Sequence, residues 1–150
     1  MTLPLVRFTV RRIMVLAGVG ALGLVWLLSS TYGPFRSVSG RGVDAHVANA
    51  RLWHCLVPDQ ATEVWFTSGY RGSRVECTID PDGFLAWCER SGWVPTPIRG
   101  DDPVMVYSAR DGRPEEVSLG LRFREIDGDF GYHGVYDASK ARAYVTYSGG

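Results

Sequence analysis

The sequence has little of what marks a metalloprotein or a common hydrolase. Its 150 residues include only three cysteines and three histidines. Neither C-x-x-C nor H-x-x-x-H occurs, although zinc ligands usually follow such spacings. The G-x-S-x-G turn that presents a nucleophilic serine is also absent. We therefore assign no catalytic residue, no metal site and no cofactor from the sequence.

The chain also lacks an excess of charge of either sign, with 16 basic and 16 acidic side chains. Three of the basic residues precede Ile13, so the remainder of the chain is slightly acidic. Proteins that bind nucleic acid neutralise phosphates with clustered lysines and arginines. The charge balance therefore excludes nucleic acid as a partner.

What the sequence does have is one long uncharged run near its start. Ile13 to Leu28 carries no charge, and the uncharged stretch continues to Phe35. A membrane-spanning helix needs about 20 mainly apolar residues, and it tolerates glycine. We therefore expect a transmembrane helix or signal-anchor at 13–33, with the lipid bilayer as a partner.

Three glycines in this run suggest an alternative. Gly18, Gly20 and Gly23 match the G-x-G-x-x-G spacing of a dinucleotide-binding loop, and Asp44 lies where a ribose-binding acid is expected. However, the segment after Gly23 is apolar on every face, whereas a helix of that fold needs a solvated side. The later chain also lacks the alternating helices of a parallel sheet. We therefore exclude a nucleotide.

Arg7, Arg11 and Arg12 precede the apolar run, and no acidic residue does. Positive charge before the first span predicts a cytoplasmic N-terminus and export of the chain beyond the span. Cleavage near 30–33 is the alternative, and it would yield a secreted or periplasmic protein. The expected parts are a cytoplasmic basic tail (1–12), the span in the inner (cytoplasmic) membrane (13–33), a Ser, Gly and Arg-rich tether (34–51) and an extracytoplasmic domain (52–150).

Apolar alternation predicts strands at 63–68, 74–79, 104–107, 117–123, 130–136 and 143–147. Between the second and third of these, Asp80 and Pro81 are typical of the start of a helix, and Gly92 of its end. The apolar face of this helix is formed by Phe84, Leu85, Trp87 and Cys88. The sequence thus predicts an α+β domain in the order ββαββββ, with one helix packed on a small antiparallel sheet.

Parts of this pattern resemble a known group of proteins. The helix start Asp80-Pro81-Asp82, its end at Gly92-Trp93 and the aromatic-rich final hairpin are similar to small, uncharacterised bacterial proteins with a membrane anchor. The resemblance would cover about 58–148. It implies the same element order and carries no known activity, so no functional residue is transferred.

The cysteines leave three alternatives open. Cys77 is expected on the inward face of a strand and Cys88 on the inward face of the following helix, so a disulfide could join them in an exported chain. Cys55 could instead pair with either of them. The third alternative is that all three thiols are free and pack as small apolar side chains.

Candidate functional residues gather on the final hairpin. His133 could act as an acid–base group beside Asp129 or Glu125, or sense pH, or simply face solvent from a strand. Aromatic platforms bind sugars, peptides and proteins, although tyrosines also form cross-strand pairs that hold sheets together. The candidate binding surface consists of Tyr132, His133, Tyr136 and Tyr144.

These observations lead to two hypotheses about function. The first is a single-pass membrane-anchored protein that presents a small extracytoplasmic binding or structural domain, with another envelope protein or a cell-wall component as its partner. The alternative is a small ligand-binding protein or enzyme with a pocket between helix and sheet near His133. A non-enzymatic role fits the sequence better, because no catalytic constellation stands out.

Overall fold

The computed structural model describes residues 10–29, 37–52 and 55–149. The chain divides into two compact units, Met1–Arg36 and Ser37–Gly150. The first unit contains helix α1 (Val10–Ser29). Within the described part of the chain, no helix has both the length and the apolar character needed to cross a membrane. Most of the predicted basic tail (1–9) and the end of the predicted span (30–33) lie outside the described residues.

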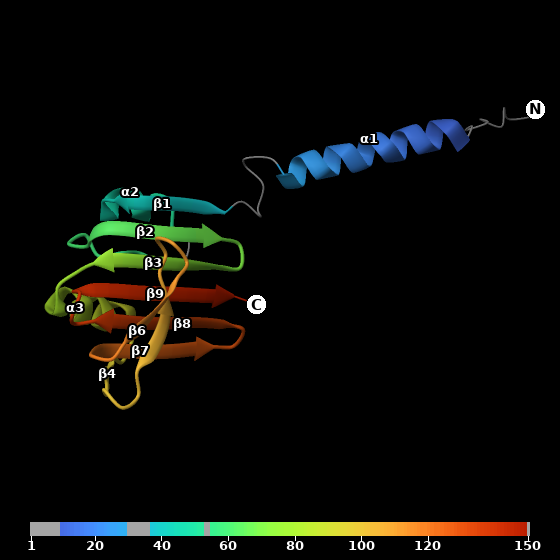
Figure 1. Ribbon diagram of the computed structural model, residues 1–150. Coiled ribbons are helices and arrows are strands. Elements are labelled where there is room, and N and C mark those ends of the chain that lie inside the picture. The colour runs from blue at the N-terminus through green and yellow to red at the C-terminus, as the bar shows by residue number, and fades with distance from the viewer. Residues whose placement is uncertain (1–9, 30–36, 53–54, 150) are drawn as a thin grey trace, which may run out of the picture. The chain divides into compact units, whose positions relative to one another are not determined.

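The second unit is an α+β domain with a mostly antiparallel sheet, which confirms the predicted fold class (Figure 1). Its main sheet has seven strands in the order β1-β2-β3-β9-β8-β7-β4, and every neighbouring pair is antiparallel. These strands are β1 (Val38–Val43), β2 (Thr62–Gly69), β3 (Gly72–Thr78), β4 (Thr96–Ile98), β7 (Gly120–Asp127), β8 (Phe130–Asp137) and β9 (Arg142–Gly149).

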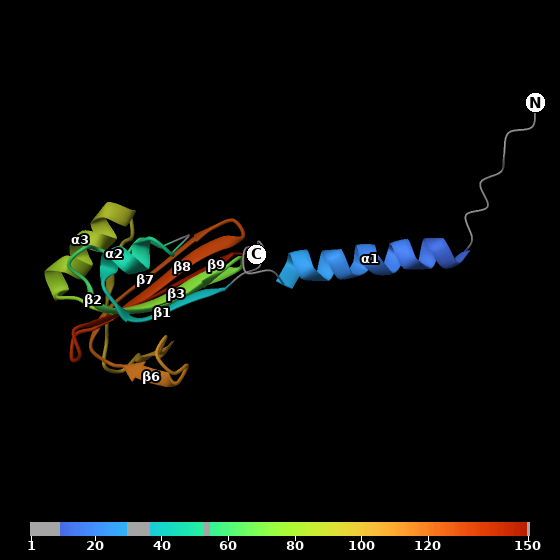
Figure 2. The same ribbon diagram turned by 90° about the horizontal axis from the view of Figure 1, so that it is seen from above.

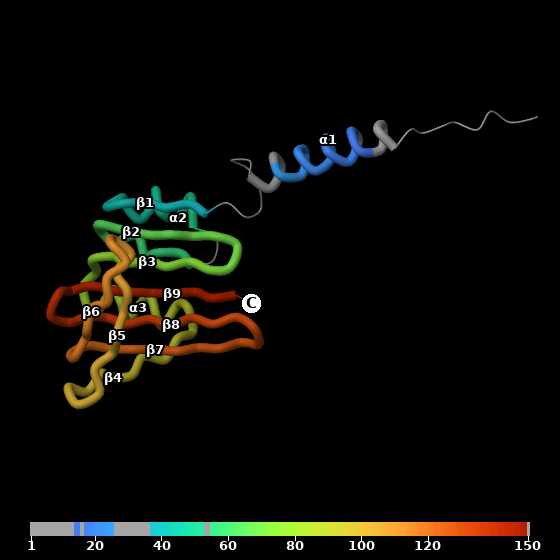
Figure 3. The backbone as a smooth tube through the Cα atoms, turned by 45° about the vertical axis from the view of Figure 1, so that its right-hand side comes forward, coloured from blue at the N-terminus to red at the C-terminus, as the bar shows by residue number. Residues whose placement is uncertain are grey.

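Both faces of this sheet are covered. Helices α2 (Ala45–Asn49) and α3 (Pro81–Ser91) lie on one face, and a two-stranded hairpin lies on the other (Figure 2). The hairpin consists of β5 (Val104–Tyr107) and β6 (Pro114–Val117), and it crosses over the strands of the main sheet (Figure 3). The sheet therefore has two buried clusters, a larger one under the helices and a smaller one under the β5–β6 hairpin.

Helix α3 begins and ends where its local sequence predicts. The Asp80 side chain accepts a hydrogen bond from the Gly83 amide at 2.6 Å, which caps the first turn. Gly92 adopts the left-handed conformation with φ 74°, and the Trp93 amide donates to the Cys88 carbonyl. Trp93 consequently folds back onto Trp87, with ring centroids 5.7 Å apart.

The tether predicted at 34–51 is wrong over 38–49, because this segment supplies β1 and α2 of the domain. Its glycines suggested flexibility, but they permit close packing instead. A Cβ atom on Gly40 would lie 2.1 Å from the Phe66 ring, and Gly42 has φ 58° where the register of β1 shifts. Glycine is the residue that allows both the contact and the bulge.

The continuous strand predicted at 117–123 is also wrong. Val117 ends β6 and is buried between the hairpin and the main sheet, whereas Gly120 begins β7 in the main sheet. Leu119, between them, is 63% exposed. The predicted order ββαββββ therefore lacks β1, α2, β4 and the break between β6 and β7. Leu85 was also expected on the buried face of α3, yet it is exposed.

Candidate functional site

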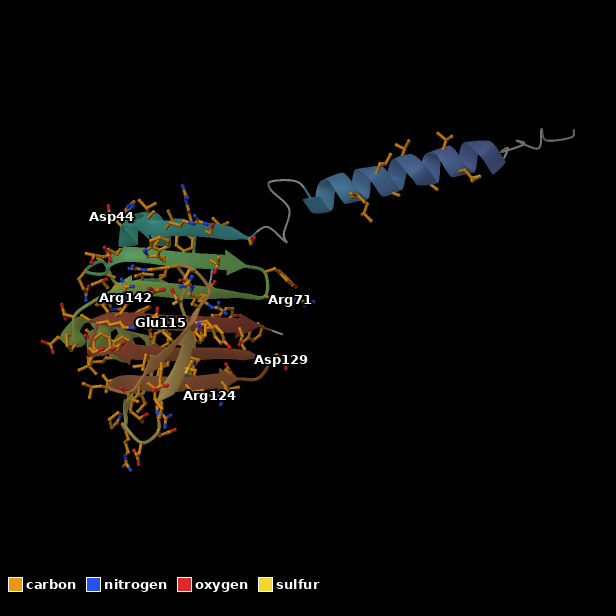
Figure 4. All side chains as sticks on the ribbon, in the orientation of Figure 1. Asp44, Arg71, Glu115, Arg124, Asp129 and Arg142 are labelled. Carbon is orange, nitrogen blue, oxygen red and sulfur yellow. The ribbon has the colours of Figure 1, made fainter. Side chains whose placement is uncertain are left out.

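A groove of about 550 Å³ opens on the helix-bearing face, between the end of α3 and the strands β7, β8 and β9. We call it the aromatic groove. It lies toward the end of the sheet that Asp129 marks in Figure 4. Its lining residues are Cys55, Leu56, Trp87, Ser91, Trp93, Glu125, Asp127, Phe130, Tyr132 and Tyr147.

The register of three strands explains how this groove forms. Glu125, Tyr132 and Tyr147 are directly opposite one another on β7, β8 and β9, so they form one row on the same face of the sheet. The next row toward the turn contains Asp127 and Phe130. Because side chains alternate between faces, both acids of β7 point to the side where the tyrosines lie.

The preceding row forms the inner wall of the groove. Phe123 is opposite Gly134, and a Cβ atom on this glycine would lie 2.0 Å from the Phe123 ring. The ring therefore lies flat over the glycine and stacks on Trp93, with centroids 4.2 Å apart and planes at 14°. Because Gly134 has no side chain, Phe123 can pack directly on the strand and stack on Trp93 at the edge of the core.

Aromatic contacts continue from this wall to the open end of the groove. Trp93 lies 5.3 Å from Tyr132, which lies 4.9 Å from Tyr147, and Tyr147 lies 6.1 Å from Phe130 (all between ring centroids). Trp87, Trp93 and Tyr147 are at most 9% exposed, whereas Phe130 is 51% exposed. The groove thus has a buried aromatic floor and a more exposed rim.

The charge of the groove is negative. Of the described residues that line it, Glu125 and Asp127 are ionisable acids and none is basic. Both acids are exposed, and neither forms an ion pair with another described residue. Burial raises the pKa of Tyr132, and Cys55, Tyr147 and Glu125 raise it further, so its hydroxyl stays protonated and neutral.

His133 lies on the opposite face of the sheet and lines a second hollow, of about 390 Å³. Its cross-strand neighbours are Arg124 on β7 and Thr146 on β9. Burial lowers the pKa of His133, and Arg124 and Arg122 lower it further, because each disfavours the protonated imidazole. Asp129 lines the same hollow, near the turn between β7 and β8 (Figure 4).

The structure does not bring the four residues of the predicted binding surface together. Tyr136 is 2% exposed and stacks on Phe84 under α3, with centroids 5.0 Å apart. Tyr144 is 5% exposed on the other face, where its hydroxyl donates to Glu115 at 3.0 Å. Only Tyr132 belongs to the aromatic groove. The pocket expected between helix and sheet is present, but it is not near His133.

The cysteines are free and buried in this structure, so the disulfide between Cys77 and Cys88 is not formed. Burial raises the pKa to about 12 for Cys55 and Cys77 and to about 11 for Cys88. All three belong to the cluster under the helices. They therefore behave as small apolar side chains with unreactive thiols.

Sequence reasoning missed a buried ionic network on the face under the hairpin. Glu76 is 0% exposed and accepts hydrogen bonds from Ser108 Oγ and the Ala109 amide, both at 2.8 Å. Its other oxygen lies 2.7 Å from Arg142 Nη1 and 3.0 Å from Arg110 Nε. These contacts tie the loop between β5 and β6 to the main sheet.

Sequence reasoning also missed Trp93, Glu125 and Asp127 as groove residues. The strand predicted at 117–123 ended before both acids, whereas β7 runs to Asp127 and puts them on one face. Nothing local indicated that α3 would leave this face open. No group of three metal-ligating side chains forms within residues 10–29, 37–52 and 55–149. No protein-family model, curated protein or solved structure matches the chain.

Proposed function

We propose that the protein is a single-pass membrane protein whose domain, Ser37–Gly150, binds a ligand outside the cytoplasm in the aromatic groove. The observation that carries the proposal is the groove itself. It combines a buried aromatic floor with an exposed acidic rim on one side of a rigid antiparallel sheet. Its volume of about 550 Å³ lies within the range of small-molecule sites, which is about 300–1,000 Å³.

The support for the membrane anchor comes from the sequence alone, because no described helix is long and apolar enough to cross a membrane, whereas the uncharged stretch of 13–35 continues beyond α1. The uncharged run from Ile13 to Leu28 follows three arginines, and the acidic residues all come after it. This distribution favours a cytoplasmic N-terminus. The domain would then face the periplasm or the cell exterior, where an envelope protein, a cell-wall component or a solute is within its reach.

The residues of the groove favour binding over catalysis. The described lining residues include no histidine and no basic group that could work with a carboxylate as an acid–base pair. The buried thiol of Cys55 has a raised pKa and is a poor nucleophile. Rigid aromatic rings provide contact area at a low cost in conformational entropy, as ligand-binding surfaces require.

Topology is tested by fusing a reporter after Gly150 in the full chain. We expect alkaline phosphatase to be active at this position and green fluorescent protein to be dark, because the domain is exported. Replacing Arg7, Arg11 and Arg12 by glutamate should reduce the phosphatase signal. A fluorescent and phosphatase-negative fusion, with the protein in the aqueous fraction, would contradict the anchor.

Binding in the groove is tested by thiol labelling of the full chain in maltoside detergent. Ser91 lines the groove and is exposed, so Ser91→Cys should react readily with a maleimide, whereas the native thiols are buried. Ser118→Cys, an exposed position that does not line the groove, is the matched control. We expect a ligand to slow labelling only at position 91.

The probes are choline, a neutral cell-wall oligosaccharide and an acidic peptide. Protection of the Ser91→Cys thiol by any of them, with no effect on Ser118→Cys, supports a binding groove. If none of the three slows the reaction at millimolar concentration, the groove is not the binding site that we propose.

A further inference from the structure

We propose that the aromatic groove takes a fully methylated ammonium group carried by a small free solute. The inference rests on the proposed function, because it names the chemistry of the ligand that this same groove would bind. Three properties of the groove lead to it: the negative charge of its described residues, the arrangement of its rings and the small number of side-chain hydrogen-bond acceptors that these residues place on its floor.

The charge of the groove selects a cation. Glu125 and Asp127 project from the same face of β7, and no described residue of the groove is basic. Neither carboxylate is neutralised by an ion pair among the described residues. An anionic ligand would meet two negative charges at the rim, whereas a cation gains from both of them.

The rings are close enough together to act on one cation at the same time. Attraction between a cation and an aromatic face extends to about 6 Å from the ring centroid. Tyr132 lies 4.9 Å from Tyr147 and 5.3 Å from Trp93, so a single positive charge can lie within range of at least two rings. Phe130 extends the aromatic surface to the rim.

The floor favours methyl groups over N–H donors. The most buried part of the lining consists of Cys55, Trp87, Trp93 and Tyr147, while the carboxylates lie on the exposed rim. The side-chain acceptors that the described residues offer on this floor are the hydroxyls of Tyr132 and Tyr147. A primary ammonium has three N–H donors and a guanidinium has five, so either group would leave some donors unpaired, which costs free energy. A trimethylammonium group has no N–H to satisfy, and it is the cation that aromatic cages recognise elsewhere.

The experiment compares choline with 3,3-dimethylbutan-1-ol, a neutral molecule of the same shape, by calorimetric titration of the full chain in maltoside detergent. We expect choline to bind about tenfold more tightly than the alcohol. The advantage should shrink as salt is added, because the rim charges are exposed. Equal binding of the two molecules, or binding of neither, would overturn the inference.

Charge-removing variants locate the effect. In Glu125→Gln/Asp127→Asn we expect the Kd for choline to rise about tenfold and that for the alcohol to stay the same. Asp129→Asn is the matched control, since Asp129 is exposed on the same turn but lines the His133 hollow instead. Unchanged affinity for choline in the double variant, or an equal loss in the control, contradicts the proposal.

Two further arms separate this inference from the proposed function. Vesicles of phosphatidylcholine present the same headgroup on a lipid. If these vesicles protect the Ser91→Cys thiol from the maleimide while free choline does not bind, the ligand is not a free solute. If the oligosaccharide protects the Ser91→Cys thiol and choline does not, the groove still binds a ligand and only the cationic ligand is excluded.

Discussion

Arg142 on β9 donates a hydrogen bond from Nη1 to Oε1 of Glu76 on β3 at 2.7 Å, and the Glu76 side chain has no exposed surface. The two residues are far apart in the sequence but lie on adjacent strands. Burying a carboxylate is costly unless it is paired and hydrogen-bonded. Both carboxylate oxygens of Glu76 are hydrogen-bonded. Oε1 accepts from Arg142, and Oε2 accepts from the Ser108 hydroxyl and the Ala109 amide.

We expect Glu76→Gln to lower the free energy of unfolding by about 3 kcal/mol, because the change removes the buried negative charge between the arginines. Both Glu76 oxygens also accept hydrogen bonds, so the amide NH2 of a glutamine would face donors. The matched control is Glu63→Gln. Glu63 contacts the same two arginines, Arg110 and Arg142, but its side chain is 63% exposed, so its loss should cost less than about 1 kcal/mol. Urea denaturation followed by tryptophan fluorescence measures both. Equal losses of unfolding free energy in the two variants would show that the burial of Glu76 does not strengthen its contribution to stability.

We expect Gly134→Ala to destabilise the domain by about 1–3 kcal/mol, since the new methyl group would displace the buried Phe123 ring and with it Trp93. Gly100→Ala is the control, because nothing lies within 4 Å of its added Cβ. In a double variant with Phe123→Leu, the cost of the alanine should shrink. Strictly additive losses would refute the contact as the cause.

The three thiols should be unreactive in the folded protein. With pKa values of about 12, 12 and 11 for Cys55, Cys77 and Cys88, almost no thiolate exists at neutral pH. Ellman's reagent should detect no thiol before unfolding and all three after unfolding without reductant. Detection of a single thiol in unfolded protein would mean that a disulfide had formed, as the sequence allowed.

His133 should make stability depend on pH in mildly acidic solution. Its folded pKa lies below the usual 6.5, so the unfolded chain binds the proton first as the pH falls. The stability that it contributes is fully present above the unfolded pKa and is lost as the pH falls toward the folded one. We expect His133→Gln to lose less stability than the native chain between about pH 7.5 and about pH 5.

His46→Gln provides the control for this measurement, because His46 is exposed on α2. The difference between the His133 variant and the native chain should vanish above about pH 7.5, where both states are deprotonated. A difference that is constant over the whole range would mean that the substitution acts through packing rather than through titration.

Local rules correctly predicted the elements that depend on neighbouring residues. The Asp80 cap and the Gly92 stop each involve groups a few positions apart. The shared face of Phe130, Tyr132, Gly134 and Tyr136 followed from alternation along one strand. The sequence therefore placed α3 and the last hairpin well.

Long-range pairing could not be predicted in this way. The sequence did not reveal that β1 pairs with β2, that β9 lies between β3 and β8, or that the chain turns at Leu119 to leave one sheet for the other. These choices depend on which apolar faces fit together, as when Phe66 covers Gly40. A glycine-rich segment looks the same in sequence whether it is solvated or packed.

The amino-acid sequence by itself determined the uncharged run at the start, the α+β class and the helix caps, because each depends on composition or on hydrogen bonds between near neighbours. Only the tertiary structure decided that Tyr136 and Tyr144 are buried and that Glu125 shares a row with Tyr132 and Tyr147. The physical reason is strand register: one residue of shift moves a side chain to the other face, and register is set by packing across the whole sheet.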